Sequence, residues 1–472
     1  MIIEIIKLQL PRSSKFFLII LWIFFGGASG LFAQQDFKAD SVMIRKIYDH
    51  ALTGGNIGPN LYHLSKNIGS RISGSANAQR AVEWGKKKME EIAPGRVYLQ
   101  EVTVPHWIRG KKERSFFISK SGKKITMQVC ALGGSVDTKG MLKAQVVEVK
   151  SWTELATLED KDVQGKFVFF NRAMDPKEIE TFKAYLAVVD QRARGAIEAG
   201  KRGAIGALVR SMTLAIDTFP HTGAMNYDPN VKKIPAAALS TMSADLLSHE
   251  LKQTPELIYG LEMNCLQLPD EKSYNVIGEI KGSIYPDEFI TIGAHIDTWD
   301  LSEGASDDGT GFVQTLEVLR LIKNLDHKPE RSIRAILYMN EESGAHGAIK
   351  YAQEAISAAE THITAIESDA GGFSPRGFRV EGTTEVTEKI KSWKSLFIPY
   401  KVAELHACQR GVDLIPMKKH AKALISLDCD DQRLFNIHHS ALDTYDKINV
   451  REVELGAAAM ASLISLISKY GL

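Results

Sequence analysis

The sequence predicts an α/β fold: a mostly parallel, doubly wound sheet that carries an inserted β-rich domain. From residue 288 onward, apolar segments of strand length alternate with helical patterns. The strands are almost continuously apolar, which is typical of a parallel sheet covered by helices on both faces. Between residues 106 and 268 the texture changes to short β-like runs among Gly-rich turns. This change predicts a separate domain with its own small core.

The first 33 residues have the pattern of a secretory signal peptide. Lys7, Arg12 and Lys15 precede the apolar run Phe16–Phe25, and small residues then lead to Ala33. A membrane anchor is the alternative, but the run is shorter than the ~20 apolar residues that a span requires. We therefore expect cleavage near Ala33 and export to the periplasm or the extracellular space, with no membrane association afterwards.

The main fold is expected to begin with residues 34–105. Helical patterns cover Ser41–Leu52 and Ala76–Ile92, and Arg96–Val104 alternates like a strand. Pro105-His106-Trp107 is read as a break. The inserted domain, residues 106–268, contains β-like runs at Gln145–Val149 and Lys166–Phe170 and one helix-then-strand unit at Ala193–Val209. It has few clustered His or acidic residues, so we expect no chemistry inside it.

The second part of the main fold, residues 269–472, is expected to follow a break at Leu268-Pro269-Asp270. The predicted strands are Glu288–Ile296, Ser332–Met339, Ile363–Ile366 and Ala423–Leu427, and the predicted helices are Thr310–Leu325, Ala345–Ser357 and Val450–Tyr470. Ligands of such sheets bind beyond the carboxyl ends of the strands. Most chemically interesting residues of this chain lie at such ends.

Composition excludes several classes of function. The 58 Lys and Arg residues nearly balance the 57 Asp and Glu residues, and no basic stripe suggests a nucleic-acid partner. The four cysteines lack C-x-x-C spacing, which argues against a zinc ribbon or a redox motif. A disulfide between Cys408 and Cys429 and buried free thiols are equally compatible with an exported chain.

The segment Ile290–Gly311 begins a candidate metal site. His295 and Asp297 stand two residues apart at the end of a strand, so both side chains project from the same face. A His ligand needs an acceptor for its second ring nitrogen, and Asp297 is placed to provide it. Asp307 follows in a Gly-rich turn before a helix, where an ordinary N-cap is the simpler explanation.

Four more residues extend this site along the chain. Glu341 and Glu342 follow the next strand, and because neighbours point in different directions, one could bind metal while the other reaches a water molecule. Asp369 ends a third strand, and His439 lies in a loop before the final helix. Each residue alone fits an ordinary polar loop position. Their occurrence at successive strand ends is what favours a site.

Taken in order, these segments resemble the co-catalytic zinc aminopeptidase family over nearly the whole mature chain. The matching segments are PHWIRG (105–110), LGGSV (132–136), PHTG (220–223), SYNVIGEIKGSIYP (273–286), HIDTWD (295–300), GASDDGTG (304–311), EE (341–342), ESDAGGF (367–373) and HHSALDT (438–444). So many matches in the same order are far more specific than any single motif.

The resemblance implies two Zn²⁺ ions. It assigns His295 and Asp369 to one ion, Glu342 and His439 to the other, and Asp307 to both. His439 is chosen over His438 because the family's ligand lies four residues before the Asp of the Asp443-Thr444 pair. Glu341 corresponds to the general base and Asp297 to the partner of His295. The inserted region corresponds to a protease-associated domain that helps to cover the site.

The function implied is hydrolysis of dipeptides or of the N-terminal bond of short peptides, by a homodimer. The segment 411–417 and the following loop to Arg433 match the family only loosely, so the substrate preference stays open. Arg410 and Arg433 are candidates for binding a substrate carboxylate by charge alone. A single-zinc glutaminyl cyclase is disfavoured by the insertion and the complete ligand set. A non-catalytic receptor-like or peptide-binding protein is disfavoured because every ligand position is filled.

Overall fold

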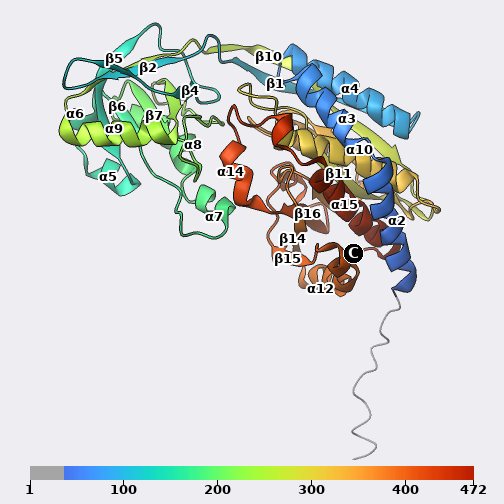
Figure 1. Ribbon diagram of the computed structural model, residues 1–472. Helices are drawn as coiled ribbons and strands as arrows, with labels where there is room; N and C mark the ends of the chain where they lie inside the picture. Colours follow the sequence, from blue (N-terminus) through green and yellow to red (C-terminus); the bar gives the residue numbers. More distant parts are fainter. Residues whose placement is uncertain (1–36) are drawn as a thin grey trace, which may run out of the picture. The chain divides into compact units, whose positions relative to one another are not determined.

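The structure, a computed structural model, describes residues 37–472. The expected signal peptide, residues 1–33, lies outside the described residues. Two mixed sheets of eight strands each organise the chain, and Figure 1 labels many of their strands. Within the described part, no helix is long and apolar enough to cross a membrane. The α/β fold class predicted from the sequence is confirmed.

The first sheet has the strand order β1-β10-β12-β11-β13-β16-β14-β15. Its centre is parallel: β12 (Arg331–Tyr338), β11 (Tyr285–His295), β13 (Thr361–Glu367) and β16 (Ala423–Cys429). The outer strands β1 (Val97–Ile108), β10 (Leu266–Ile280) and β14 (Pro375–Gly382) join it through antiparallel pairs, and β15 (Glu404–Ala407) lies parallel to β14. The four central strands were expected, whereas β14 and β15 were not.

Helices cover both faces of this sheet. Along β12, Ile336 and Tyr338 belong to the core cluster that includes Tyr351 of α11 (His346–Ser357). Leu337, between them, points to the other face, where it lies with Phe312 of α10 (Thr310–Lys323) against Gly85 of α4 (Ala76–Ile92). The closing helix α15 (Val450–Tyr470) packs against α10, and Figure 1 shows the two side by side. Alternating side chains of one apolar strand therefore bury both helical layers.

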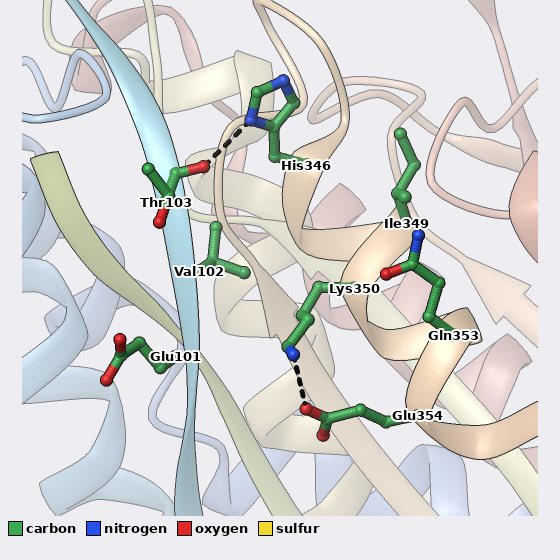
Figure 2. A pocket seen from close by; sticks show the side chains of 8 residues that line it. All are labelled: Glu101, Val102, Thr103, His346, Ile349, Lys350, Gln353 and Glu354. Carbon is green, nitrogen blue, oxygen red and sulfur yellow. Dashed lines mark hydrogen bonds and ion pairs between the residues drawn. The ribbon is translucent and has the colours of Figure 1, made fainter. Parts of the chain in front are cut away.

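The other helices outside the segment between β1 and β10 are α2 (Lys38–Gly54), α3 (Ile57–Tyr62), α12 (Thr384–Ser392), α13 (Lys394–Phe397) and α14 (Leu434–Ile437). Between β1 and α11 there is a cleft of 620 Å³, shown in Figure 2. His346 Nδ1 lies 2.9 Å from the carbonyl oxygen of Thr103 at its edge. None of the expected site residues lines this cleft.

The second sheet has the order β3-β2-β9-β5-β6-β7-β8-β4. Its strands are β2 (Arg114–Ile118), β3 (Lys124–Thr126), β4 (Val129–Ala131), β5 (Leu142–Val149), β6 (Phe167–Phe170), β7 (Gly206–Arg210), β8 (Ala236–Leu239) and β9 (Ile258–Glu262). The helices of this segment are α5 (Trp152–Thr157), α6 (Asp160–Val163), α7 (Thr181–Leu186), α8 (Asp190–Lys201) and α9 (Thr241–Gln253). All of these elements come from chain between β1 and β10.

The two expected breaks at the ends of this segment are wrong. β1 runs through Pro105 to Ile108, with a register shift between Val104 and His106. β10 runs through Pro269, and at the same register shift Pro269 and Asp270 of β10 have no partner residue on β1. Proline lacks an N–H, so a bulge in a two-stranded ribbon can contain it without the loss of a ladder hydrogen bond. A continuous antiparallel ribbon therefore leads from the first sheet into the second.

Candidate metal centre and its surroundings

Parallel pairing brings the expected site residues together at one edge of the first sheet. His295 is the last residue of β11, Glu341 and Glu342 follow β12, and Asp369 follows β13. These three strands are neighbours, so their carboxyl ends meet. Asp307 comes from the turn before α10, and His439 from the loop after α14.

His295 is fully buried and faces two carboxylates. Its Nδ1 lies 2.9 Å from the backbone carbonyl of Asp297, which can only accept, so Nδ1 carries the proton. Its Nε2 lies 3.2 Å from Asp307 Oδ1 and 3.8 Å from Asp369 Oδ1. Burial lowers the pKa of His295, but the two carboxylates raise it more, and the net pKa lies well above the usual value.

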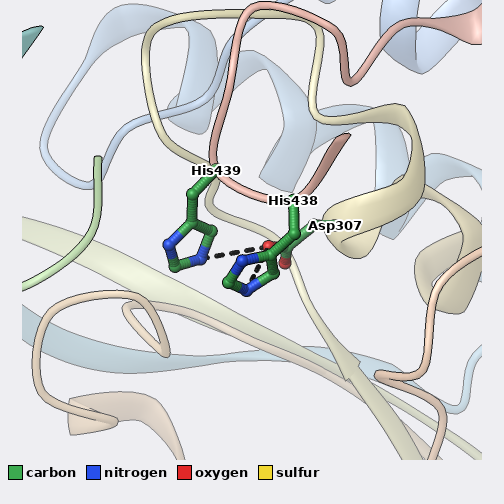
Figure 3. A group of neighbouring side chains, drawn as sticks. All are labelled: Asp307, His438 and His439. Carbon is green, nitrogen blue, oxygen red and sulfur yellow. Dashed lines mark ion pairs between the residues drawn. The ribbon is translucent and has the colours of Figure 1, made fainter. Parts of the chain in front are cut away.

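His439 faces the other oxygen of Asp307. Its Nε2 lies 3.1 Å from Asp307 Oδ2 and 3.1 Å from Glu342 Oε2. Figure 3 shows Asp307 beside His438 and His439, whose rings stack with centroids 3.6 Å apart. His438 lies farther away, with Nε2 3.7 Å from Asp307 Oδ2. Asp307 therefore stands between two groups of donors, one on each of its carboxylate oxygens.

The ligand-type atoms of this cluster are suited to a metal ion, and hydrogen bonds among them do not engage all of them. Two buried atoms that point into the cluster, His295 Nε2 and Glu342 Oε1, have no hydrogen-bond partner among the described residues. Nδ1 of His295 keeps its proton against the Asp297 carbonyl, so a bound cation would take the place of the proton that the neighbouring carboxylates hold on Nε2. Lone pairs that converge in a buried place are stabilised by a cation, and mixed His and carboxylate sets suit zinc.

Asp297 has a different contact from the one expected. Its carboxylate Oδ1 lies 3.9 Å from His295 Nδ1, beyond hydrogen-bond distance. Oδ1 instead accepts from the backbone N–H groups of Asn340 (2.6 Å) and Glu341 (3.1 Å). Oδ2 accepts from the Ser73 hydroxyl at 2.9 Å. Asp297 thus reaches His295 through its backbone and the Glu341 loop through its side chain.

Glu341 differs from its neighbours in the site. Its carboxylate has no hydrogen bond or ion pair among the described residues, and the side chain is half-buried. Burial, together with the carboxylates of Asp369 and Glu342, raises the pKa of Glu341 well above its usual value, against the opposing charge of His295. A raised pKa makes this carboxylate a stronger proton acceptor than an ordinary surface Glu, as a general base requires.

Sequence reasoning missed three supporting residues. Asn340 has φ of 75° and donates through its side chain to Ser73 and Ser343. Arg71 is fully buried and donates to four backbone carbonyls, including those of Glu303 and Gly304 before Asp307. Asp443 accepts from the backbone N–H groups at 306 and 307. Asp443 belongs to the D-T pair, so a motif pointed to it without showing its role.

The segment between β1 and β10 contacts this site directly. The backbone N–H of Thr222 donates to the carbonyl of His439 at 2.9 Å. The guanidinium of Arg192 on α8 lies 3.4 Å from His439 Nδ1. Arg109, at the end of the ribbon, pairs with Asp300 at 2.6 Å. These contacts come from three parts of the segment, so it forms one wall around the donors.

The other candidates are engaged elsewhere. Arg410 pairs with Glu180 and Asp431, and Arg433 lies 3.6 Å from Glu452. All four cysteines are free: the disulfide between Cys408 and Cys429 is not formed, and of these two thiols only Cys429 is buried while Cys408 is exposed. Another His and carboxylate group, Glu404, His406 and Asp428, lies apart from the metal centre. There Arg379 donates to Asp428 at 2.7 Å and already provides the positive charge.

The fold and the converging donors define a metallopeptidase, and the comparisons agree. Residues 275–464 match the family described as "Peptidase family M28". Carboxypeptidase Q of Xenopus laevis is 35% identical over 80% of this chain and 78% of its own length. Carboxypeptidase Q of Homo sapiens is 31% identical over 84% of this chain and 82% of its own.

Solved structures give the same result. A peptidase M28 precursor from Shewanella amazonensis superposes with a TM-score of 0.86 at 31% identity, covering 91% of this chain and 97% of its own. A zinc aminopeptidase from Bacillus subtilis shares the fold, with a TM-score of 0.62 at 17% identity, covering 88% and 94%. The chain belongs to peptidase family M28 and is similar to carboxypeptidase Q. The enzyme class predicted from the sequence, a zinc-dependent exopeptidase, is confirmed.

Proposed function

We propose that the protein is an exported di-zinc exopeptidase that hydrolyses dipeptides or the N-terminal bond of short peptides. The observation that supports this most strongly is the position of Asp307. Each of its two carboxylate oxygens lies within 3.2 Å of a different imidazole. A carboxylate shared between two donor groups is what a pair of neighbouring metal ions requires.

His295 and Asp369 would hold one zinc ion, and Glu342 and His439 the other, with Asp307 common to both. His439 is preferred to His438 because only His439 is also close to Glu342. When bound, the ions would supply Lewis acidity toward a scissile carbonyl and an attacking water molecule. Five protein ligands around two ions leave open positions for substrate.

Glu341 would act as the general base. Its carboxylate has no hydrogen bond or ion pair within residues 37–472, and burial raises its pKa. It would accept the proton of the attacking water on a carboxylate oxygen and deliver the same proton to the leaving amine. Asp297 would fix the backbone at Glu341 through the hydrogen bond at 3.1 Å, so the base keeps its orientation through both transfers.

Three wider features belong to this proposal. The segment 106–268 would be a protease-associated domain that covers the site, consistent with the contacts of Thr222 and Arg192 with His439. Export would follow cleavage near Ala33. The enzyme would be a homodimer, in keeping with the resemblance. No nucleic-acid or membrane partner is proposed. A receptor-like role is disfavoured because all five ligand positions are occupied by ligand-type side chains.

The test is hydrolysis of a panel of free dipeptides, the same dipeptides N-acetylated, and the same C-amidated, each with zinc and with chelator. Chelator-sensitive cleavage of free dipeptides alone would support a zinc dipeptidase. Cleavage that tolerates amidation but not acetylation would support an aminopeptidase. Absence of any cleavage by protein that holds two zinc ions would refute the proposed activity.

A further inference from the structure

We infer that the cavity between the Ser343-Gly344 turn and the inserted segment is the subsite for the residue released by hydrolysis, and that it selects residues with uncharged side chains. The inference rests on the proposed function, because the cavity is placed relative to Glu341. Its volume is 230 Å³. Ligand pockets are commonly ~300 Å³ or larger, so this cavity suits one side chain rather than a peptide.

The cavity adjoins the loop that carries the general base. Ser343 and Gly344 directly follow Glu341-Glu342 and line the cavity. Ser73, which donates to Asp297, lines it as well. Because Glu341 would deliver a proton to the leaving amine, the residue bearing that amine lies on the Glu341 side of the scissile bond. The cavity is therefore beside the leaving residue and not beside the acyl residue.

The inserted segment and the ribbon supply the other walls. The full lining is Ile72, Ser73, Pro105, Trp107, Gly133, Gly134, Ala224, Met225, Asn226, Gln267, Trp299, Ser343 and Gly344. It includes parts of the quoted motifs at 105–110 and 132–136, whose purpose the metal centre does not explain. The cavity gives these motifs a role, since they bring small and apolar groups to the edge of the site.

Trp299 links the cavity to the metal centre. Its ring meets the His439 ring edge-on with centroids 6.0 Å apart, and it contacts Trp107 at 6.4 Å. Its benzene edge lies against Gly133, where an added Cβ would come within 1.8 Å of Trp299 Cη2. No side chain fits at residue 133 without displacing Trp299. The wall nearest the metal ligands is thus rigid and apolar.

Among residues 37–472, no charged side chain lines the cavity. The Arg109 guanidinium lies behind the Trp107 wall, with its Cζ 5.2 Å from the centroid of the Trp107 ring. It already forms ion pairs with Asp300 and Glu113. Of the polar lining groups, the amides of Gln267 and the hydroxyls of Ser73 and Ser343 are engaged in hydrogen bonds. The Trp299 indole N–H has no hydrogen-bond partner in the part of the chain that the structure describes. A charged substrate side chain would therefore lose water without gaining an opposite charge, which is unfavourable.

The test varies the two residues of dipeptide substrates independently. We expect kcat/KM to be at least ~10²-fold higher for Ala-Leu and Ala-Met than for Ala-Glu, Ala-Asp and Ala-Lys, because unpaired charges bind poorly. Substitution Asn226→Arg places a cation in the lining. It should raise kcat/KM for Ala-Glu relative to Ala-Leu by at least ~10-fold, the size of one charge-assisted hydrogen bond.

The matched control is Asn230→Arg, which adds the same charge in the same loop at an exposed residue outside the lining. It should leave the preference unchanged. The inference is overturned if wild-type enzyme cleaves Ala-Glu as well as Ala-Leu, if both variants shift the preference equally, or if Asn226→Arg alters only the preference for the first residue. If zinc-loaded enzyme cleaves no dipeptide, the proposed function fails and the subsite falls with it. Cleavage without discrimination overturns the subsite alone.

Discussion

The carboxylate of Asp297 accepts a hydrogen bond from the backbone N–H of Asn340 at 2.6 Å. The same oxygen accepts from the N–H of Glu341, and the other oxygen accepts from Ser73. One buried side chain thereby joins the end of β11, the loop after β12 and the segment before α4. The loop that carries Glu341 and Glu342 is held by this carboxylate, while the imidazole of His295 is oriented by a carbonyl.

This arrangement predicts different effects for two substitutions of Asp297. Asp297→Asn retains one oxygen, which can still accept from the two backbone N–H groups. Its amide NH₂ can donate to the Ser73 hydroxyl oxygen. The kcat should therefore fall by no more than ~10-fold, which corresponds to about one weakened hydrogen bond. Asp297→Ala leaves the donors without an acceptor and should lower kcat by at least ~10²-fold. Steady-state kinetics on a dipeptide, with zinc measured by elemental analysis, tests both.

The contrast between the two variants decides between two roles for Asp297. If its charge polarised His295, the Asn variant would be as defective as the Ala variant, and zinc at the His295 position would be lost in both. Equal defects would therefore contradict the positioning role. Ser73→Ala, which removes only the donor to Oδ2, should have an effect no larger than that of Asp297→Asn.

Glu341→Gln should separate catalysis from metal binding. Glutamine is nearly isosteric and cannot accept the proton, so kcat should fall by ~10²–10⁴-fold, the usual contribution of a general base. Zinc content should stay near two ions per chain, since Glu341 is not among the proposed ligands. Turnover equal to wild type would reject the role of Glu341. Loss of zinc would move Glu341 into the ligand set.

The central fold could be predicted because its strands and helices are strongly patterned. The helices Ala76–Ile92 and Val450–Tyr470 agree with α4 and α15 at both ends. The ribbon formed by β1 and β10 was missed, because Pro105 and Pro269 are local signals for a break and only the long-range pairing shows that the strands continue. Strands β14 and β15 were missed for a similar reason: both lie in segments with many charged residues, and their partners are distant in sequence.

The candidate site could be predicted as a set of residues but not as a network. Asp307, Asp369 and His439 were found because ordered motifs carry them. The contact of Asp297 with the Glu341 loop was not predicted. An i, i+2 spacing on a strand indicates the face of the sheet from which a side chain projects, but it does not identify the group that donates a hydrogen bond to that side chain. Asn340 adopts a left-handed conformation and Arg71 caps carbonyls in a distant turn. Neither has a local sequence signal.

His439 and His438 provide a matched pair of substitutions. His439 Nε2 is within 3.1 Å of both Asp307 and Glu342, whereas His438 approaches Asp307 alone at 3.7 Å. His439→Ala should lower the zinc content by about one equivalent, because a catalytic zinc has few protein ligands to spare. His438→Ala should retain both ions. Elemental analysis after gel filtration tests the pair, and the reverse result would assign His438 as the ligand.

His221, in the inserted segment, should make stability depend on pH. It is 2% exposed, and burial lowers its pKa from 6.5 to about 4. The folded state thus binds fewer protons than the unfolded state between these values, so stability rises with pH through this window and is lost as pH falls below 6.5. Between pH 7.5 and pH 5, the buried His221 should lower the free energy of unfolding by about 2 kcal/mol.

His221→Gln removes this contribution, so urea unfolding of the variant should show a smaller loss of stability at pH 5 than that of the wild type. Equal pH dependence in wild type and His221→Gln would show that His221 is protonated in the folded protein, and that its burial does not exclude the charged form.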